Sequence, residues 1–580
     1  MAPALASPLD QLTAASSRRR FIGGAMAMGL SATVAVRLAD AVAQKASPAA
    51  GAEVDFNALG DDQVGGSFPL TDEKTTLRVL IPSNADVGSF EYEDNEFTRW
   101  YEDRTNVHVE WSIVPADEAQ TGLNVRLVGG DYGDVIMSFN PTPAVQQLYG
   151  GLGTFVALND LIDEHAVEFA RVVEQYPLSL DVITATDGKI YSLPYVNDCF
   201  HCAQDRKFFI YQPWLETLGL EMPTTTEDLF NVLVAFRDGD PNGDGEPVYP
   251  LATCINSWNN ELDLTLMNSF VFNPGEPYLF NQDGSVTAAY ATDGWKEGVK
   301  YMARLFAEGL IDPESFTQAA EQLIAKTSGD GPNRVGAAVG GSWGVFVDWQ
   351  PDDPTARWAD FVLAPPFEGP EGVRISPYNP YLPYATGNFI ITDKAEDPAL
   401  AFRWADGLYD LETTMRNVQG SLGSSWRWAR EGEAGIDGEQ AIWAGIPGDT
   451  TQVGPKSEGW IQTGPSFRSS RVRFGEKLAD ESLRSTNLDV ITQEVLEPYR
   501  QPAEMWLPPM FFSEDQVIVV AEGTTTLVPF VKEQFARWVT GQGDVESEWE
   551  SYLEQLEAMG LGEYLDIHQT TFDSQKNAGS

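Results

Sequence analysis

The sequence predicts an α/β protein of two lobes, each a mainly parallel sheet flanked by helices, with a hinge between the lobes. Three observations lead to this fold class. The chain has 580 residues, too many for one ordinary hydrophobic core. Near the N-terminus, strand and helix patterns alternate at short separations, as in parallel sheets. Near residue 195, an apolar strand pattern is broken by proline beside polar residues, which favours a passage between lobes.

The first lobe begins with two strands joined by a helix. Residues 77–82 form an apolar run typical of a buried strand, and residues 107–114 alternate between apolar and polar side chains. Between them, Phe97, Trp100 and Tyr101 have helical spacing. Parallel sheets bind ligands beyond the carboxyl ends of their strands. We therefore expect Asn84, Asp86 and Asn140 to line a ligand site.

The first crossing between lobes is predicted near residue 192. Asp187 and Gly188 form a turn pair, and residues 190–196 read as a strand that Pro194 interrupts. Asn197 and Asp198 follow directly. Further along, threonines 224–226 ahead of Glu227 are typical of a capped helix start.

These motifs, in this order, resemble a known protein family. The segment 129–136, GGDYGDVI, is similar to the family's turn that leads into a cleft strand, and residues 535–569 are similar to its C-terminal helices. The chain resembles the family 1 extracellular solute-binding proteins of bacterial ABC importers, above all the long oligosaccharide branch that includes aldouronate binders. The resemblance spans roughly residues 70 to 575 and is weakest between about 410 and 510.

The resemblance implies a type II periplasmic-binding-protein fold that closes on its ligand by a hinge. It also implies that the tryptophan matching Trp343 stacks on ligand and that the acidic residue matching Asp198 binds hydroxyl groups. Sugars bind to flat aromatic rings and to amides or carboxylates. On this basis the second lobe is expected to contribute Tyr195, Asn197, Asp198, Trp258 and Trp343. For each tryptophan, simple packing in the core remains the alternative.

The domain boundaries follow from these crossings. Residues 1–43 are predicted to be a twin-arginine signal peptide, because Arg18 and Arg19 precede an apolar run and an Ala-Val-Ala site at 41–43. Residues 44–70 form a lead-in; residues 71–191 with 369–425 form lobe 1, and residues 192–368 with 426–580 form lobe 2. A periplasmic or extracellular protein is expected, and no cysteine lies near the cleavage site for a lipid anchor.

The net charge disfavours some classes of binding partner, and the cysteines indicate a disulfide or thiols and not a zinc site. The formal net charge of −49 disfavours nucleic acid and anionic membranes as partners. Cys199, Cys202 and Cys254 allow one disulfide or buried thiols. A zinc site at residues 199–202 is disfavoured because zinc takes four ligands and no second pair of ligands is present.

A calcium loop is a further candidate. Asp240, Asn242 and Asp244 are spaced as alternate ligands, Gly245 occupies the sixth position, and Glu246 would offer its backbone carbonyl. The twelfth position is Leu251, where an EF-hand has a bidentate glutamate. The sequence leaves open a structural calcium ion or an empty turn, and no cofactor is otherwise required.

The predicted function is therefore that of an exported substrate-binding protein that captures an oligosaccharide and delivers it to the permease of an ABC importer. We expect a monomer. The alternative is a non-sugar solute such as a peptide, and after that an exported enzyme acting on polysaccharide. Catalytic motifs such as Gly-x-Ser-x-Gly or His-Glu-x-x-His are absent, so we expect no enzyme.

Overall fold

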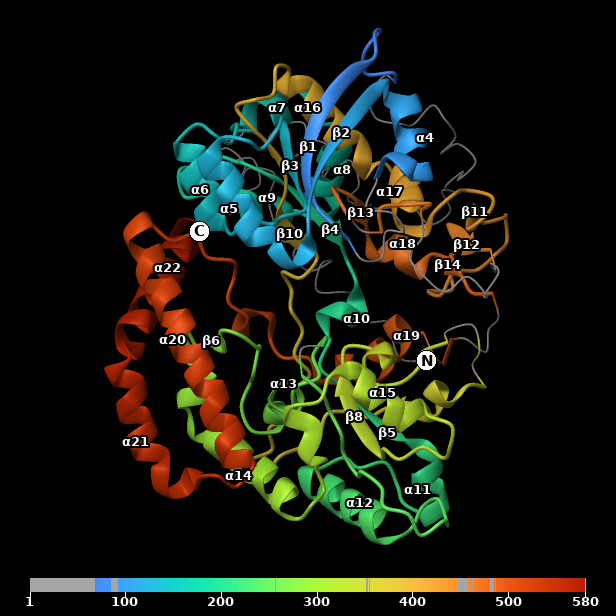
Figure 1. Ribbon diagram of the computed structural model, residues 1–580, viewed down its shortest axis with the longest axis vertical. Helices are drawn as coiled ribbons and strands as arrows, with labels where there is room; N and C mark the ends of the chain where they lie inside the picture. The colour runs from blue at the N-terminus through green and yellow to red at the C-terminus, as the bar shows by residue number, and fades with distance from the viewer. Residues whose placement is uncertain are drawn as a thin grey trace, which may run out of the picture. The chain divides into compact units, whose positions relative to one another are not determined.

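The structure, a computed structural model, describes residues 68–578 except 85–91, 256, 351–352, 354, 447–456, 462, 480–483 and 486. Its contacts divide the chain into two units, each discontinuous in sequence (Figure 1). Unit 1 holds the described residues up to Asp198 together with Pro383–Ala479. Unit 2 holds Cys199–Leu382 and the described part of Asp480–Ala578. The predicted signal peptide and most of the lead-in lie outside the described residues.

The divisions between units differ from the predicted crossings. They fall after Asp198, Leu382 and Ala479, whereas the sequence placed crossings near residues 192, 368 and 425. The third differs most, because residues just after 425 form strands that pair with one another within unit 1. That stretch lies where the family resemblance is weakest. One consequence is that Tyr195, Asn197 and Asp198, expected in the second lobe, belong to unit 1.

The centre of unit 1 is a six-stranded sheet of order β13-β4-β10-β3-β1-β2. β1 pairs in parallel with β2 and β3, and β10 runs antiparallel to both β3 and β4. The strands are β1 (Thr75–Pro82), β2 (Val107–Val114), β3 (Val135–Met137), β4 (Leu193–Asn197), β10 (Tyr384–Ile391) and β13 (Phe467–Arg468). Because β10 reverses direction between them, β1, β3 and β4 all point the same way.

Helices pack around this sheet (Figure 1). They are α4 (Glu96–Thr105), α5 (Ala119–Gly129), α6 (Pro143–Gly151), α7 (Asn159–His165), α8 (Glu168–Gln175), α9 (Leu178–Ile183), α16 (Pro398–Asp406) and α17 (Leu411–Gln419). The expected helix after the first strand is α4. It begins where the Asn95 side chain accepts a hydrogen bond from Phe97 N, and it ends at Asn106 in the left-handed conformation.

A small sheet of order β11-β12-β14 completes unit 1. Its strands are β11 (Trp426–Trp428), β12 (Trp443–Gly445) and β14 (Glu476–Lys477), and the short helix α18 (Ser470–Phe474) precedes β14. Trp426 and Trp443 are buried in its core with Val472. This packing explains why these tryptophans stand outside helical patterns without being exposed.

Unit 2 is built on a three-stranded sheet of order β8-β5-β9 and a hairpin of β6 and β7. Its strands are β5 (Lys207–Tyr211), β6 (Leu279–Gln282), β7 (Ser285–Ala288), β8 (Ala337–Gly340) and β9 (Phe361–Leu363). β5 pairs antiparallel with both β8 and β9, so these named strands depart from the mainly parallel sheet expected for each lobe. Parallel pairing in this unit occurs as bridges such as Tyr249 with Val335.

The helices of unit 2 bury most of its apolar surface. They are α10 (Phe200–Ala203), α11 (Gln212–Leu218), α12 (Thr226–Asp238), α13 (Leu262–Leu266), α14 (Asp293–Ala307), α15 (Ala320–Ser328), α19 (Leu488–Val495), α20 (Glu514–Val539), α21 (Val545–Ala558) and α22 (Leu561–Ala578). α12 begins at a capping box of Thr225 and Asp228, as the sequence predicted. Figure 1 shows α20, α21 and α22 as the long red helices, with α14 packed against α20 and α21.

Candidate functional site: polar strand ends and an aromatic turn

Polar side chains gather at one edge of the unit 1 sheet. Asn84 follows β1, Asn140 follows β3, and Asn197 with Asp198 ends β4. Because these three strands point the same way, their carboxyl ends share an edge. The strand-end geometry expected from the sequence is therefore present. Asp86 lies outside the described residues.

Asp198 is the most strongly bonded of these side chains. Its carboxylate accepts a hydrogen bond from the Tyr176 hydroxyl at 2.6 Å and another from the Ser470 hydroxyl. Burial, together with the negative charge of Asp198, raises the pKa of Tyr176. The phenol therefore stays protonated and donates. Helix α18 supplies Ser470, a partner that was not predicted from the sequence.

Asn197 and Tyr195 lie near arginines. The Asn197 amide oxygen accepts from Arg473 Nη2 at 2.7 Å and from Arg473 Nε at 3.2 Å. Burial raises the pKa of Tyr195 to about 12, against the opposing effect of Arg468 and Arg473. β13 brings Arg468 beside β4, where it pairs in register with Asn197. The arginines were missed because they come from the stretch where no motif was recognised.

The other two asparagines of this edge, Asn84 and Asn140, each have their own hydrogen-bond partners. Asn84 donates to Thr463 Oγ1 at 2.9 Å and to the Ile461 carbonyl at 3.2 Å. Asn140 is exposed, has a positive φ of 48°, and its amide oxygen accepts from Asn388 Nδ2 at 3.2 Å. Both side chains therefore sit in fixed positions with polar atoms near solvent.

Unit 2 presents a different kind of surface, which we call the aromatic turn: residues 341–344 with the indoles of Trp258 and Trp349. The structure describes all 16 tryptophans, and only Trp258 and Trp349 are exposed, at 39% and 41%. A methyl group built on Gly341 would lie 2.3 Å from the Trp258 ring, and one on Gly344 would lie 3.4 Å from the Trp349 ring. Only glycine at position 341 lets the Trp258 ring lie this close to the turn, whereas a side chain at position 344 would make an ordinary contact with Trp349.

The Trp258 segment is anchored to β8. The Trp258 carbonyl accepts from Gly341 N at 2.9 Å, and Asn260 donates to the Val339 carbonyl at 2.9 Å. The imidazole of His201 approaches the indole edge-on, with the ring centroids 6.0 Å apart. The sequence predicted Trp258 but missed Trp349, which stands among polar residues in no periodic pattern.

Trp343 has a different environment from the one expected. It is 2% exposed, its indole N–H donates to the Phe361 carbonyl at 2.8 Å, and it packs between Phe209 and Trp358. A ring that is 2% exposed offers no free face to a sugar. Gly341 makes room for the exposed Trp258 ring instead, so we assign Trp343 to the core.

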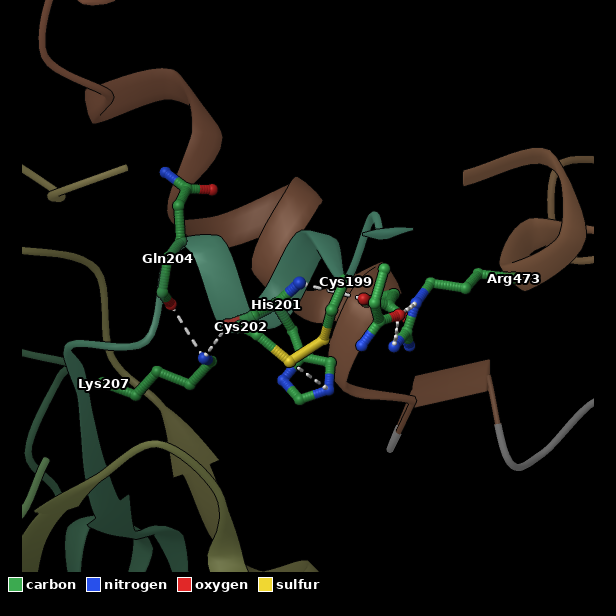
Figure 2. The surroundings of a disulfide bond; sticks show 8 residues. Cys199, His201, Cys202, Gln204, Lys207 and Arg473 are labelled. Carbon is green, nitrogen blue, oxygen red and sulfur yellow. Dashed lines mark hydrogen bonds between the residues drawn. A yellow bond between two sulfur atoms is a disulfide. The ribbon is translucent and has the colours of Figure 1, made fainter. Parts of the chain in front are cut away.

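Cys199 and Cys202 form a disulfide across α10, and Cys254 is a buried thiol whose pKa burial raises to about 12. Among the described residues, Cys199, His201 and Cys202 are the only three metal-ligating side chains that converge, and the disulfide occupies both sulfurs. Below them, the Lys207 ammonium donates to the carbonyls of His201 and Gln204 at 2.6 and 2.7 Å (Figure 2). Burial lowers the pKa of Lys207 to about 7.

The expected calcium loop follows α12. Asp240 accepts from the backbone N–H of Asp244 at 3.1 Å and of Gly245 at 3.2 Å. Asn242 accepts from the Trp214 indole at 3.0 Å, and Asp244 is paired with Arg334. The side-chain oxygens of Asp240, Asn242 and Asp244, which were expected to bind a cation, are therefore engaged with protein groups.

The family model for bacterial extracellular solute-binding proteins matches residues 84–412, more than half of the chain. The chain belongs to this family. It is 26% identical over 517 residues to the fructooligosaccharide ABC transporter substrate-binding protein FusA of Streptococcus pneumoniae, covering 88% of this chain and 92% of FusA.

Solved structures of this family share the fold. FusA in complex with kestose aligns with a TM-score of 0.72 at 24% identity, over 87% of this chain and 99% of FusA. An extracellular solute-binding protein of Bifidobacterium longum subsp. infantis aligns with a TM-score of 0.72 at 21% identity, over 87% of this chain and 98% of the other. Another FusA structure, with a TM-score of 0.72, is described as an EF-hand mutant. These alignments confirm the predicted two-lobe fold class.

No helix among the described residues is long and apolar enough to cross a membrane. Family membership makes this an extracellular-type binding protein, and its twin-arginine export remains a prediction.

Proposed function

We propose that this protein is the substrate-binding component of an ABC importer and that it captures a neutral oligosaccharide for delivery to the permease subunits. Family membership and the likeness to FusA, whose name states a fructooligosaccharide ligand, support the transport role. Export by the twin-arginine route, a monomeric state and the absence of catalysis are parts of the same proposal.

The observation that carries this proposal is the aromatic turn. An exposed indole costs free energy in water, and a core would normally bury it. Here two indoles from separate segments lie against one glycine-containing turn, and the remaining 14 of the 16 tryptophans are not exposed. Flat rings of this kind stack on the C–H faces of sugars, so we assign Trp258 and Trp349 to ligand stacking.

The polar edge of unit 1 supplies the complementary chemistry. We assign hydroxyl recognition to Asn84, Asp86, Asn140, Tyr195, Asn197 and Asp198. The hydrogen bonds already made by Asp198 and Asn197 fix these acceptors before ligand binds, so less conformational entropy is lost on binding.

The ligand is proposed to be uncharged because of the charge of the chain. A net charge of −49 repels polyanions at long range. Arg473, near Asn197, already donates to a protein acceptor, the Asn197 amide oxygen. A neutral glycan meets no such repulsion.

The test is isothermal titration calorimetry of the mature protein with kestose, a neutral glucan oligomer, an alginate oligomer and a tetrapeptide. We expect saturable binding of a neutral glycan, and chromatography of the mixture after incubation should return that glycan intact. If only the peptide binds, the ligand is a non-sugar solute and the assignment of an oligosaccharide is wrong. Glycan cleavage would contradict the assignment as a binding protein.

A further inference from the structure

The loop that resembles a calcium site carries a positive charge supplied by the protein. Arg334, just before β8, directs its two Nη atoms at the carboxylate of Asp244, at 3.1 and 2.8 Å. This is the bidentate geometry in which guanidinium and carboxylate bind most strongly. The pairing, followed by the hydrogen bond from Glu246 N, lowers the pKa of Asp244. Asp244 is thus a carboxylate whose partner cation is already present.

The other expected ligands are also engaged. The amide of Asn242 is used at both ends, because its oxygen accepts from the Trp214 indole and its nitrogen donates to the Asn333 carbonyl at 2.9 Å. A calcium ion bound to Asn242 would have to share this oxygen with the buried Trp214 N–H. The donor set of this loop therefore does not fit a calcium ion.

The residue at the twelfth position of the loop, Leu251, has no carboxylate with which to bind calcium. Leu251 is fully buried in the unit 2 core, and its backbone bonds to Leu310 and Asp312. A bidentate carboxylate is what an EF-hand requires there. Asp238, the acid just before the loop, pairs with Arg237 instead. Among the described residues, no group of three converging acidic side chains includes this loop.

We propose that Arg334 replaces calcium in this loop, so that the guanidinium neutralises Asp244 and ties the loop to the segment entering β8 without a metal. Asn242 makes the second tie between the same two segments, through Asn333. The backbone pair of Tyr249 N with the Arg334 carbonyl, at 2.7 Å, makes the third. The loop is thereby held by protein groups where an EF-hand relies on the ion.

The test is thermal unfolding of the full mature protein in EDTA and in millimolar CaCl2, with direct calcium titration by calorimetry. We expect the same Tm in both buffers and no saturable calcium heat. The variant Arg334→Gln removes the charge and should have a lower Tm that calcium does not restore, since Leu251 still leaves the loop without the bidentate carboxylate that calcium needs. The matched control Arg304→Gln breaks the bidentate pair with Glu227, which lies at the opposite end of α12 and is more exposed, and should lower Tm less.

Three results would overturn the proposal. A wild-type Tm that falls in EDTA or rises saturably with calcium would mean that the ion is a normal part of the loop. An Arg334→Gln variant with unchanged Tm would mean that Arg334 does not hold the loop, and one whose Tm calcium restores would mean that the loop still has a donor set for calcium. If Arg334→Gln fails to fold, Asp244→Asn is measured instead: it should lower Tm without any calcium response, and a calcium-dependent Tm would contradict the replacement.

Discussion

The polar edge of unit 1 and the aromatic turn of unit 2, both proposed above to bind ligand, hold their side chains in place by different means. At the polar edge, Asp198 and Asn197 are fixed by hydrogen bonds from Tyr176, Ser470 and Arg473. At the aromatic turn, Trp258 is fixed by its backbone and by the absence of a side chain on Gly341. The polar edge offers directed hydrogen bonds, each of which adds little net free energy of binding. The aromatic turn offers apolar area for stacking. We therefore expect stacking to dominate affinity and hydrogen bonds to determine which sugar binds.

The largest effect is expected from Trp258→Ala. Removing the exposed ring should weaken glycan binding by about 1 to 3 kcal/mol, roughly 5- to 150-fold in Kd, because the stacking area is lost. Titration calorimetry measures the change. The control is Trp343→Phe, which alters a buried ring and should lower Tm while leaving Kd unchanged. Equal Kd in wild type and Trp258→Ala would remove Trp258 from the site.

Asp198→Asn should have a smaller effect. The substitution keeps the shape of the side chain but replaces charge-assisted hydrogen bonds to sugar hydroxyls by neutral ones, which costs about 1 kcal/mol, or roughly 5-fold in Kd. The exposed Asp131, paired with Arg126, provides the control Asp131→Asn. If both variants bind as wild type does, the polar edge does not contact the ligand through Asp198.

Gly341→Ala tests the aromatic turn without removing either indole. The added methyl would meet the Trp258 ring at 2.3 Å, so the ring must move and binding should weaken less than in Trp258→Ala. Gly331→Ala adds a methyl into open space in the same unit and should leave Kd unchanged. A Gly341→Ala variant that retains wild-type affinity would show that the position of the Trp258 ring is unimportant.

The smallest effect concerns Lys207, which bonds to α10 below the disulfide. Burial lowers the pKa of Lys207 from 10.5 to about 7, so between these values the unfolded chain binds a proton that the folded chain has lost. The free energy of unfolding should therefore increase as pH rises from 7 toward 10.5, and this contribution of Lys207 is lost as pH falls toward 7. We expect Tm between pH 7 and 9 to rise more in wild type than in Lys207→Met. Parallel pH profiles would contradict this assignment.

The sequence predicted the regular parts of unit 1 well, for reasons that are local. β1 and β2 follow from apolar runs and alternation, and α4 follows from helical spacing between them. The strand-end positions of Asn84, Asn140, Asn197 and Asp198 follow from the same patterns. Family membership was also predicted correctly, because it depends on motifs spread over the chain.

Three features could not be predicted, because each depends on contacts between distant segments. Trp343 looks exposed in its Gly-Ser-Trp-Gly context, but Phe209 and Trp358 bury it. Arg334 lies far along the chain from the loop that it neutralises. The strands after residue 425 pair within unit 1, which no local pattern signals. The spacing of residues in the sequence identifies side chains that could bind a ligand. It does not identify the distant protein groups that already bond to those side chains or bury them.

The most direct test of the account is calorimetric titration of one neutral oligosaccharide into wild type, Trp258→Ala and Trp343→Phe under the same conditions. We predict saturable binding to wild type and to Trp343→Phe with similar Kd, and a Kd weaker by roughly 5- to 150-fold in Trp258→Ala. A Kd that depends on Trp343 and not on Trp258, or no binding of any neutral glycan, would contradict it.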